Sequence, residues 1–287
     1  MPFSEIAKIG PPAPDELEVT IFGPSFGECV VVHFGSNRWF IVDSCVYSDI
    51  DGPVAAHYLT CLGLDLGAVV ESILVTHWHD GHCKGISKLV EHCDRAAIWI
   101  PATLTDVEFI RFVKRLSKNK TLVGGVKTKE FSAILEELHR RKNAGSPNFG
   151  LASQRVTMHQ SKGAQLAHGS DFKLVALSPS SPSHGDGLDF LARVALQMPR
   201  AKRPKGSLGS PSPNDISVAS LMEVGDAAIL LGADLENGKA SSGWNAVLNA
   251  NRASAFGAKA AVYKIPHHGS KTAHNENVWT DTNSPSE

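Results

Sequence analysis

Short apolar runs separated by polar turns dominate the N-terminal part of the chain. They are rich in β-branched residues and alternate roughly with polar positions, which indicates strands. A turn at 24–27 and a hairpin turn at Ser36–Asn37 separate the first three runs. The pattern predicts strands at 17–23, 28–34, 38–43, 70–76 and 96–100, and helices at 53–62 and 86–93.

The spacing of the apolar residues changes in the middle of the chain. Its apolar residues recur at helical spacing, with charges between them. They are Phe109, Phe112, Val113 and Leu116, and then Phe131, Ile134, Leu135 and Leu138. This pattern favours a helical insert or lid over about 102–160. After a strand at 172–177, the segment 178–213 is rich in Pro, Ser and Gly, which predicts a loop with a short helix at 188–197.

Strands return in the C-terminal part, at 216–224, 227–232 and 260–265, with a helix at 241–250. Strands first, then a strand–helix alternation, then strands again favour an α/β fold with two sheets covered by helices. We expect one domain over 17–272. The segments 1–16 and 273–287 are predicted to be tails, so the chain is either truncated at its C-terminus or completes its sheet differently.

Composition narrows the class of protein. The 287 residues include 28 Lys plus Arg and 29 Asp plus Glu, and this near-neutral balance argues against bulk electrostatic attachment to nucleic acid. A local basic patch remains compatible with it. No apolar run approaches the roughly 18 residues that span a bilayer, and the N-terminus lacks a signal-peptide pattern. Five cysteines without a C-x-x-C pair suit a reducing compartment, so we expect a cytoplasmic protein without membrane attachment.

The strongest candidate site is the sequence HWHDGH at 77–82, directly after a predicted strand. His77, His79 and His82 lie within six positions, although only 13 histidines occur in 287 residues. Neutral imidazoles are common ligands of zinc and similar ions. A metal site is therefore favoured over a surface cluster of polar residues.

Three further strand ends carry potential ligands. Asp43 follows one strand, Asp234 ends another, and His267 and His268 follow a third. Strand ends at one edge of a sheet share a cleft, so these residues are expected to join the histidine cluster. Asp234 would bridge two metals or cap a helix. Asp43 would accept the proton on the other ring nitrogen of a ligand histidine.

The order and spacing of these motifs resemble the metallo-β-lactamase fold superfamily. The resemblance is strongest to the branch found as the soluble domain of bacterial DNA-uptake (competence) channel proteins, and covers about 17–101 and 172–272. It rests on IVDSC at 41–45, VTHWHDGHCKGI at 75–86, LSPSSPS at 177–183, NDISVASLMEVGDAAILLGADLE at 214–236 and KIPHHGS at 264–270. It implies a four-layer αββα sandwich with metals between the sheet edges.

The resemblance also implies a role for each motif residue. Asp43 would orient a ligand. One histidine of the pair His267 and His268 would bind metal, and the sequence does not decide which one. We place His267 first as the ligand and His268 as a catalytic residue. The expected cofactor is Zn²⁺, as one or two ions, with Mn²⁺ or Mg²⁺ as alternatives. The implied metal ligands are His77 and His79 for the first ion, His82 and His267 for the second, and Asp234 between them.

One position departs from the family pattern. The motif's aspartate should stand at 81, where this chain has Gly81, and Asp80 comes one position early. Three interpretations follow: Asp80 is recruited through the flexible Gly81, the site holds one metal only, or Gly81 is a substitution that disables an enzyme. Asp80 and Gly81 are therefore both candidate catalytic positions.

The leading functional hypothesis is a metal-dependent hydrolase of phosphodiester bonds, a nuclease with nucleic acid as its substrate. The resemblance to DNA-uptake proteins implies this substrate more than the spacing of the motif residues does. Hydrolysis of peptide, ester or lactone substrates is the first alternative. A catalytically silent, metal-holding module that recognises nucleic acid or a protein partner is the second. Basic residues suited to phosphate contacts, or to a solvated face, are Arg200, Lys202, Arg203 and Lys205.

Overall fold

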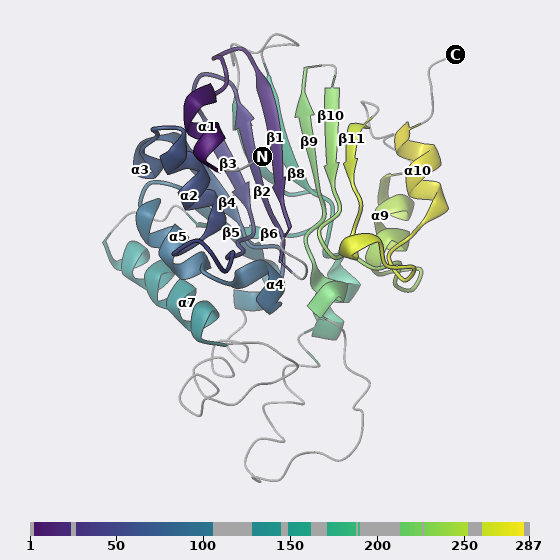
Figure 1. The fold of residues 1–287 in the computed structure, drawn as a ribbon. Helices are drawn as coiled ribbons and strands as arrows, with labels where there is room; N and C mark the ends of the chain where they lie inside the picture. The colour runs from purple at the N-terminus through teal and green to yellow at the C-terminus, as the bar shows by residue number, and fades with distance from the viewer. Residues whose placement is uncertain are drawn as a thin grey trace. The chain divides into compact units, whose positions relative to one another are not determined.

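The computed structural model describes residues 3–23, 27–105, 128–144, 149–161, 171–187, 189, 213–225, 227–251 and 260–283. They form two compact units, each built on one β-sheet with helices packed on it (Figure 1). The predicted α/β class with two sheets is confirmed, while the stacking into four layers stays a prediction. Unit 1 comprises the described residues of Met1–Ile100, Lys120–Gly150 and Ser161–Phe172, and unit 2 those of Pro101–Asn119, Leu151–Gln160 and Lys173–Glu287.

Unit 1 is built on a six-stranded sheet in the order β1-β2-β3-β4-β5-β6. The first three strands pair antiparallel, and β3, β4 and β5 pair parallel, with helices in the crossovers. Helices α2, α5 and α7 cover one face (Figure 1). The strands are β1 Leu17–Phe22, β2 Cys29–Phe34, β3 Trp39–Val42, β4 Val70–Leu74, β5 Ala97–Pro101 and β6 Phe149–Ala152; the helices are α1 Phe3–Ile9, α2 Val54–Cys61, α3 Leu66–Val69, α4 Asp80–Cys83, α5 Ile86–His92 and α7 Thr128–Asn143.

Strands β2 and β3 are buried along their whole length, which explains their nearly continuous apolar sequences. The hairpin between them turns at Ser36 and Asn37, whose φ values are 51° and 58°. Positive φ at both central residues is what a two-residue type I′ turn requires. The predicted hairpin is therefore confirmed, and the Trp39 indole N–H donates to the Asn37 side-chain oxygen at 3.2 Å.

The predicted helical insert is only partly helical. Helix α7 confirms its second half, whereas the first half lies outside the described residues. The end of the insert contains strands β6 and β7, so the expectation of an all-helical segment up to 160 is wrong there. Both strands have at most five residues, and periodicity cannot assign runs that short.

Unit 2 is built on a five-stranded sheet in the order β11-β10-β9-β8-β7, in which β9 and β10 form an antiparallel hairpin and β10 and β11 pair parallel. None of the described helices is both long and apolar enough to cross a membrane. The strands are β7 Thr157–Ser161, β8 Phe172–Ala176, β9 Ser220–Val224, β10 Ala227–Leu231 and β11 Ala260–Lys264. The helices are α9 Gly243–Asn251 and α10 Glu276–Asn283, with 3₁₀ turns η1 Ala102–Thr105, η2 Pro213–Ile216 and η3 His267–Gly269. Residues 181–187 are also helical, within the segment that was predicted to be mostly loop.

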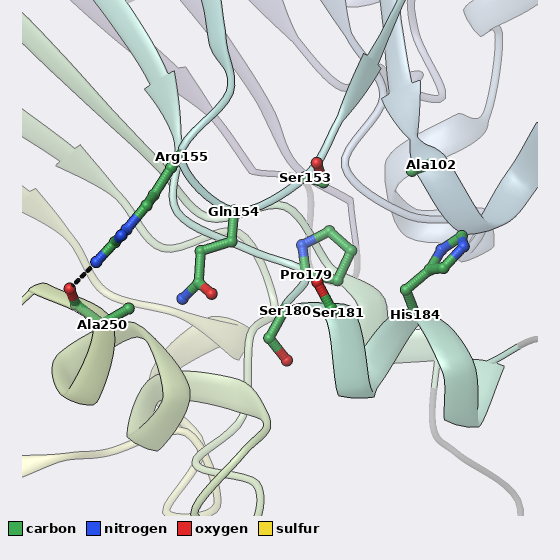
Figure 2. Close-up of a pocket in the computed structure, with 9 residues that line it drawn as sticks. All are labelled: Ala102, Ser153, Gln154, Arg155, Pro179, Ser180, Ser181, His184 and Ala250. Carbon is green, nitrogen blue, oxygen red and sulfur yellow. Dashed lines mark hydrogen bonds between the residues drawn. The ribbon is translucent and has the colours of Figure 1, made fainter.

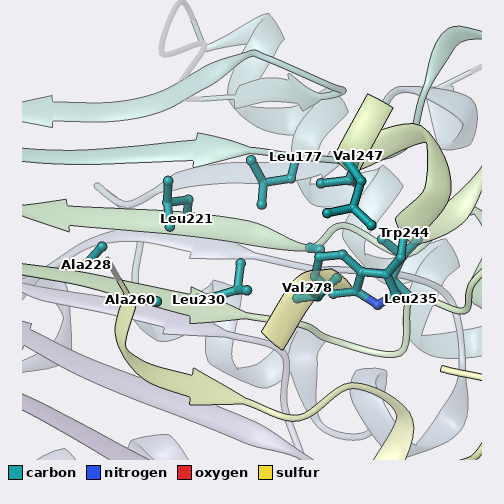
Figure 3. Packing of buried hydrophobic residues seen from close by; sticks show 11 residues of the cluster. Leu177, Leu221, Ala228, Leu230, Leu235, Trp244, Val247, Ala260 and Val278 are labelled. Carbon is teal, nitrogen blue, oxygen red and sulfur yellow. The ribbon is translucent and has the colours of Figure 1, made fainter. Parts of the chain in front are cut away.

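The core of unit 2 corrects the prediction of a C-terminal tail. Trp244 and Val247 of α9 pack against Leu221 and Leu230 of the sheet, and the fully buried Val278 of α10 joins them (Figure 3). The segment 273–287 therefore contains a helix instead of a tail. Its short polar sequence hid the helix, since few of its positions are apolar.

The N-terminal segment 1–16 likewise contains a helix, α1, where a tail was expected. The Phe3 ring stacks on Phe22 at 6.2 Å between centroids and meets the His57 ring edge-on at 4.7 Å. These ring contacts hold α1 against unit 1.

The burial of His33 in β2 is expected to make the free energy of unfolding fall at acidic pH. The side chain is fully buried, and burial lowers its pKa, an effect that nearby Glu16 and Glu18 only partly offset. The unfolded chain then binds the proton more tightly than the folded chain. The contribution of His33 is therefore complete above the unfolded pKa of about 6.5 and is lost as the pH falls below it.

We expect His33→Leu to flatten the fall in the free energy of unfolding below about pH 6.5, because the variant has no imidazole to protonate. Urea unfolding at a series of pH values measures this difference. A variant whose pH dependence matches that of the wild type would contradict the assignment.

Candidate metal centre

The histidine motif lies in the loop between β4 and α4 and in α4 itself. Strand β4 ends at Leu74, and His79 is the N-cap residue of α4, so the chain turns sharply between them. The turn brings three rings together: the His77 and His82 centroids are 4.3 Å apart, and the His79 centroid lies 6.0 and 6.4 Å from them, respectively. His77 and His82 are therefore close neighbours, whereas His79 stands farther out and, among the described residues, does not join the group whose ligand atoms lie within 4.8 Å of one another.

Asp43 lies beside this cluster because β3 and β4 are parallel neighbours whose carboxyl ends share one edge. Its carboxylate is buried and accepts hydrogen bonds from the Thr76 N–H, the Thr76 hydroxyl and His82 Nδ1, each at 2.7 Å. Asp43 adopts φ 61°, a left-handed conformation that aspartate tolerates better than most residues. The backbone thus turns this carboxylate toward the β4 loop.

These bonds assign the tautomers of two histidines. Asp43 can only accept, so His82 carries its proton on Nδ1. The Thr76 hydroxyl donates to Asp43 and must therefore accept from His77 Nδ1, 2.9 Å away. In both rings Nδ1 is the donor, which leaves Nε2 with the lone pair that a metal ion needs.

This donor set fits a divalent ion. Asp43, His77 and His82 each offer one ligand atom, and these atoms lie within 4.8 Å of one another. Since the Asp43 oxygens already accept three hydrogen bonds, we assign Asp43 to orienting the rings and the two imidazoles to binding. A carboxylate behind a ligand histidine is the usual arrangement in zinc sites.

Cys83 is buried beside the motif but has no ligand character. Its thiol donates to the His77 carbonyl oxygen at 3.0 Å. Burial raises the pKa of this thiol well above its ordinary value, and Asp43 and Asp80 raise it further. This buried thiol, bonded to the backbone, is therefore structural.

Gly81 lies inside α4, and its carbonyl oxygen accepts the Glu28 N–H at 3.0 Å. Position 81 therefore presents no carboxylate to the site. In the described part of the chain, Asp80 is also not among the residues whose donor atoms come within 4.8 Å of both His77 and His82.

Unit 2 holds the other predicted residues on the loops after β10 and β11. Gly232 makes the loops fit, because a Cβ there would lie 2.9 Å from both the Lys264 carbonyl oxygen and Pro266 Cβ. The next turn is fixed by the Ala233 carbonyl, which accepts from the buried Lys264 ammonium at 3.0 Å. Asp234 is buried, and its N–H donates to the Ser217 hydroxyl at 3.2 Å.

The geometry of unit 2 separates the two neighbouring histidines. A ring nitrogen of His268 lies within 4.8 Å of an Asp234 carboxylate oxygen. His267 instead approaches Glu236, with Nδ1 3.3 Å from its carboxylate, and Asn214, 3.4 Å from Nε2. This arrangement favours His268 as the ligand that pairs with Asp234, whereas the sequence analysis placed His267 first and left the choice open.

The sequence analysis assigned no role to Thr76 or Ser217, although both lie inside the segments 75–86 and 214–236 that carry the resemblance. The basic residues Arg200, Lys202, Arg203 and Lys205 lie outside the described residues.

Thr76→Val is expected to weaken zinc binding about 10- to 100-fold, the usual effect of losing a group that orients a ligand histidine. The valine has nearly the same shape but cannot connect His77 to Asp43. Competition with a chromophoric chelator measures the change in affinity. Thr76→Ser restores the hydroxyl and should restore binding; equal affinities of the Val and Ser variants would contradict the relay.

No protein-family model and no curated protein matches the chain. Solved structures are similar to it. Metallo-β-lactamase SMB-1 bound to 2-mercaptoethanesulfonate is 14% identical with a TM-score of 0.42, over 92% of this chain and 81% of that one. Rm3 metallo-β-lactamase is 13% identical with a TM-score of 0.41, over 88% and 77%. The metallo-β-lactamase fold protein YhfI from Bacillus subtilis is 12% identical with a TM-score of 0.38, over 78% and 64%.

Proposed function

We propose that the chain is a metal-dependent hydrolase whose metal is held by the histidine motif after β4. The observation that carries the proposal is the fixed tautomer of His77 and His82, whose Nδ1 protons are held by Thr76 and Asp43. Such fixation prepares Nε2 for a metal at neutral pH and has little purpose in a solvated polar cluster.

Some of these residues would bind the metal ion, and others orient the histidine rings that bind it. His77, His79 and His82 would hold the ion, and Asp43 keeps two of the rings in place. When bound, a divalent ion supplies an acidified water and neutralises charge on a phosphate or carbonyl oxygen. Asp234 and His268 as further ligands are a prediction from the motif pattern, refined by their proximity to each other.

A phosphodiester, and specifically DNA or RNA, is the substrate class that we propose. Its support is the resemblance of the motifs to the soluble domain of DNA-uptake channel proteins and the basic composition of the segment around 200–205. All five cysteines are free, which agrees with the proposed reducing compartment. Ester, lactone or peptide substrates are the alternative within the same chemistry.

Gly81 favours one second candidate function. Without the aspartate that the motif pattern expects there, the chain would hold one metal and act as a binding module for nucleic acid or a protein. Such a module would retain the histidine geometry described above and would show no turnover.

The test combines a metal count with turnover. The full chain would be loaded with Zn²⁺ or Mn²⁺, analysed by elemental mass spectrometry and incubated with labelled single- and double-stranded DNA and RNA. We expect at least one ion per chain and metal-dependent cleavage. His77→Ala should lose both, and His92→Ala, an exposed histidine on α5, should lose neither.

Two other results have distinct meanings. Bound metal with salt-sensitive nucleic-acid binding and no cleavage would favour the module. A chain that binds no metal would overturn the proposal altogether.

A further inference from the structure

A cleft of about 590 Å³ opens in unit 2, between the turn that follows β6, the segment after β8 and the end of α9 (Figure 2). Its volume lies within the range of small-molecule sites, about 300 to 1,000 Å³. Arg155 stands at one end and His184 at the other, with Gln154 and Ser180 between them (Figure 2).

The lining has a definite chemical character. None of the nine lining residues is acidic, and none is Phe, Tyr or Trp. Arg155 supplies a permanent positive charge and His184 an imidazole ring. The Ser153 and Ser181 hydroxyls and the Gln154 side chain supply hydrogen-bonding groups. The Gln154 amide nitrogen is held by its bond to the Ala246 carbonyl oxygen at 3.2 Å, and the buried Ser180 hydroxyl already donates to the Ser241 carbonyl oxygen at 2.7 Å. Thr103 bonds His184 Nδ1 and so fixes the ring. An anionic, hydroxyl-bearing ligand matches this lining.

Arg155 is held in a costly conformation. Its φ is 68°, in the left-handed region that is unfavourable for a residue other than glycine. Its backbone N–H donates to the Ala176 carbonyl oxygen at 2.8 Å, and its guanidinium donates to the Ala250 carbonyl oxygen across the cleft. A glycine would adopt this turn without strain, so the turn itself does not require the arginine. Strain of this kind is concentrated at binding sites.

The cleft is large enough for a ligand bigger than a single inorganic anion. A single phosphate would occupy a small part of it, and the remaining lining consists of hydroxyl, amide and imidazole groups suited to sugar hydroxyls. A guanidinium carries five N–H donors and binds phosphate oxygens in pairs.

We propose that this cleft binds a small phosphorylated sugar, with Arg155 on the phosphate and Gln154, His184 and the serines on the sugar hydroxyls. The lining lies within unit 2 and includes none of the residues assigned to the metal. The proposal therefore stands independently of hydrolysis.

Calorimetric titration of the full chain, kept metal-free with EDTA, tests the proposal with ribose 5-phosphate as the probe. We expect saturable binding, at least tenfold weaker binding of ribose, and no tighter binding of adenosine 5′-monophosphate, because no Phe, Tyr or Trp lines the cleft. Arg155→Gly should weaken ribose 5-phosphate at least tenfold. It should not lower the melting temperature, since glycine relieves the positive φ.

Matched variants keep the result interpretable. Arg155→Lys retains the charge without the paired donors and should bind with intermediate affinity. Arg140→Gln, an exposed arginine on α7 of unit 1, should bind as the wild type does. Absence of saturation at about 10 mM ligand (a free energy near −2.7 kcal/mol) would overturn the proposal. So would full affinity in folded Arg155→Gly, or equal affinity for ribose.

Discussion

Gly81→Asp is expected to raise phosphodiester hydrolysis by roughly 100-fold or more and to raise the number of bound metal ions. A second ion, or a better-held first one, is worth several kcal/mol of charge stabilisation, and about 2.7 kcal/mol corresponds to that factor. The backbone admits the substitution, because residue 81 lies inside α4 and its φ is not in the left-handed region. Elemental analysis and cleavage of labelled DNA measure the two effects.

Gly81→Asn provides the matched control, because it adds the same bulk without the charge and should gain little. Asp80→Asn in the wild-type background shows whether Asp80 already serves the site: a loss of metal or activity would mean that it does. If Gly81→Asp folds but gains neither metal nor turnover, the interpretation of Gly81 as a disabling residue is wrong.

Arg141→Met is expected to lower the free energy of unfolding by about 3–5 kcal/mol, the usual cost of removing one partner of a buried, hydrogen-bonded charge pair. The Arg141 guanidinium is buried and bonds Glu137 at 2.8 Å. It also donates to the carbonyl oxygens of Val90, Cys93 and Ala96, at 2.9, 3.0 and 2.8 Å. Its loss would leave acceptors unsatisfied between α7 and the end of α5. Urea unfolding monitored by circular dichroism measures the change.

Arg140→Met is the natural comparison, since the neighbouring arginine bonds the same carboxylate at 2.6 Å but is 62% exposed. Arg140 and then Arg141 hold the pKa of Glu137 below its ordinary value. An exposed pair contributes about 0–1 kcal/mol, so Arg140→Met should be nearly neutral. Similar losses in both variants would mean that the charge of α7, rather than the buried carbonyl contacts, holds the helix.

Most strands were predictable from the sequence, β2 and β3 most clearly, because both are buried along their whole length and are apolar apart from His33. The histidine cluster was predictable because its members are neighbours in the chain. The relay through Thr76 was not, since a threonine before a histidine is unremarkable until Asp43 turns toward it with a positive φ.

The choice between His267 and His268 also required three dimensions. Both residues adopt left-handed conformations, with φ values of 46° and 50°, and these determine which ring faces Asp234. Strands β6 and β7 and helix α10 escaped prediction because each has too few apolar positions for a period to emerge.

The close packing at Gly232 requires a residue without a side chain between the loops after β10 and β11. Any larger side chain would push against the Lys264 carbonyl and Pro266, and so would wedge apart the two loops that carry Asp234 and His268. A saturation-mutagenesis screen should accordingly find residue 232 as intolerant as the acidic and imidazole side chains themselves, although it has no reactive group of its own.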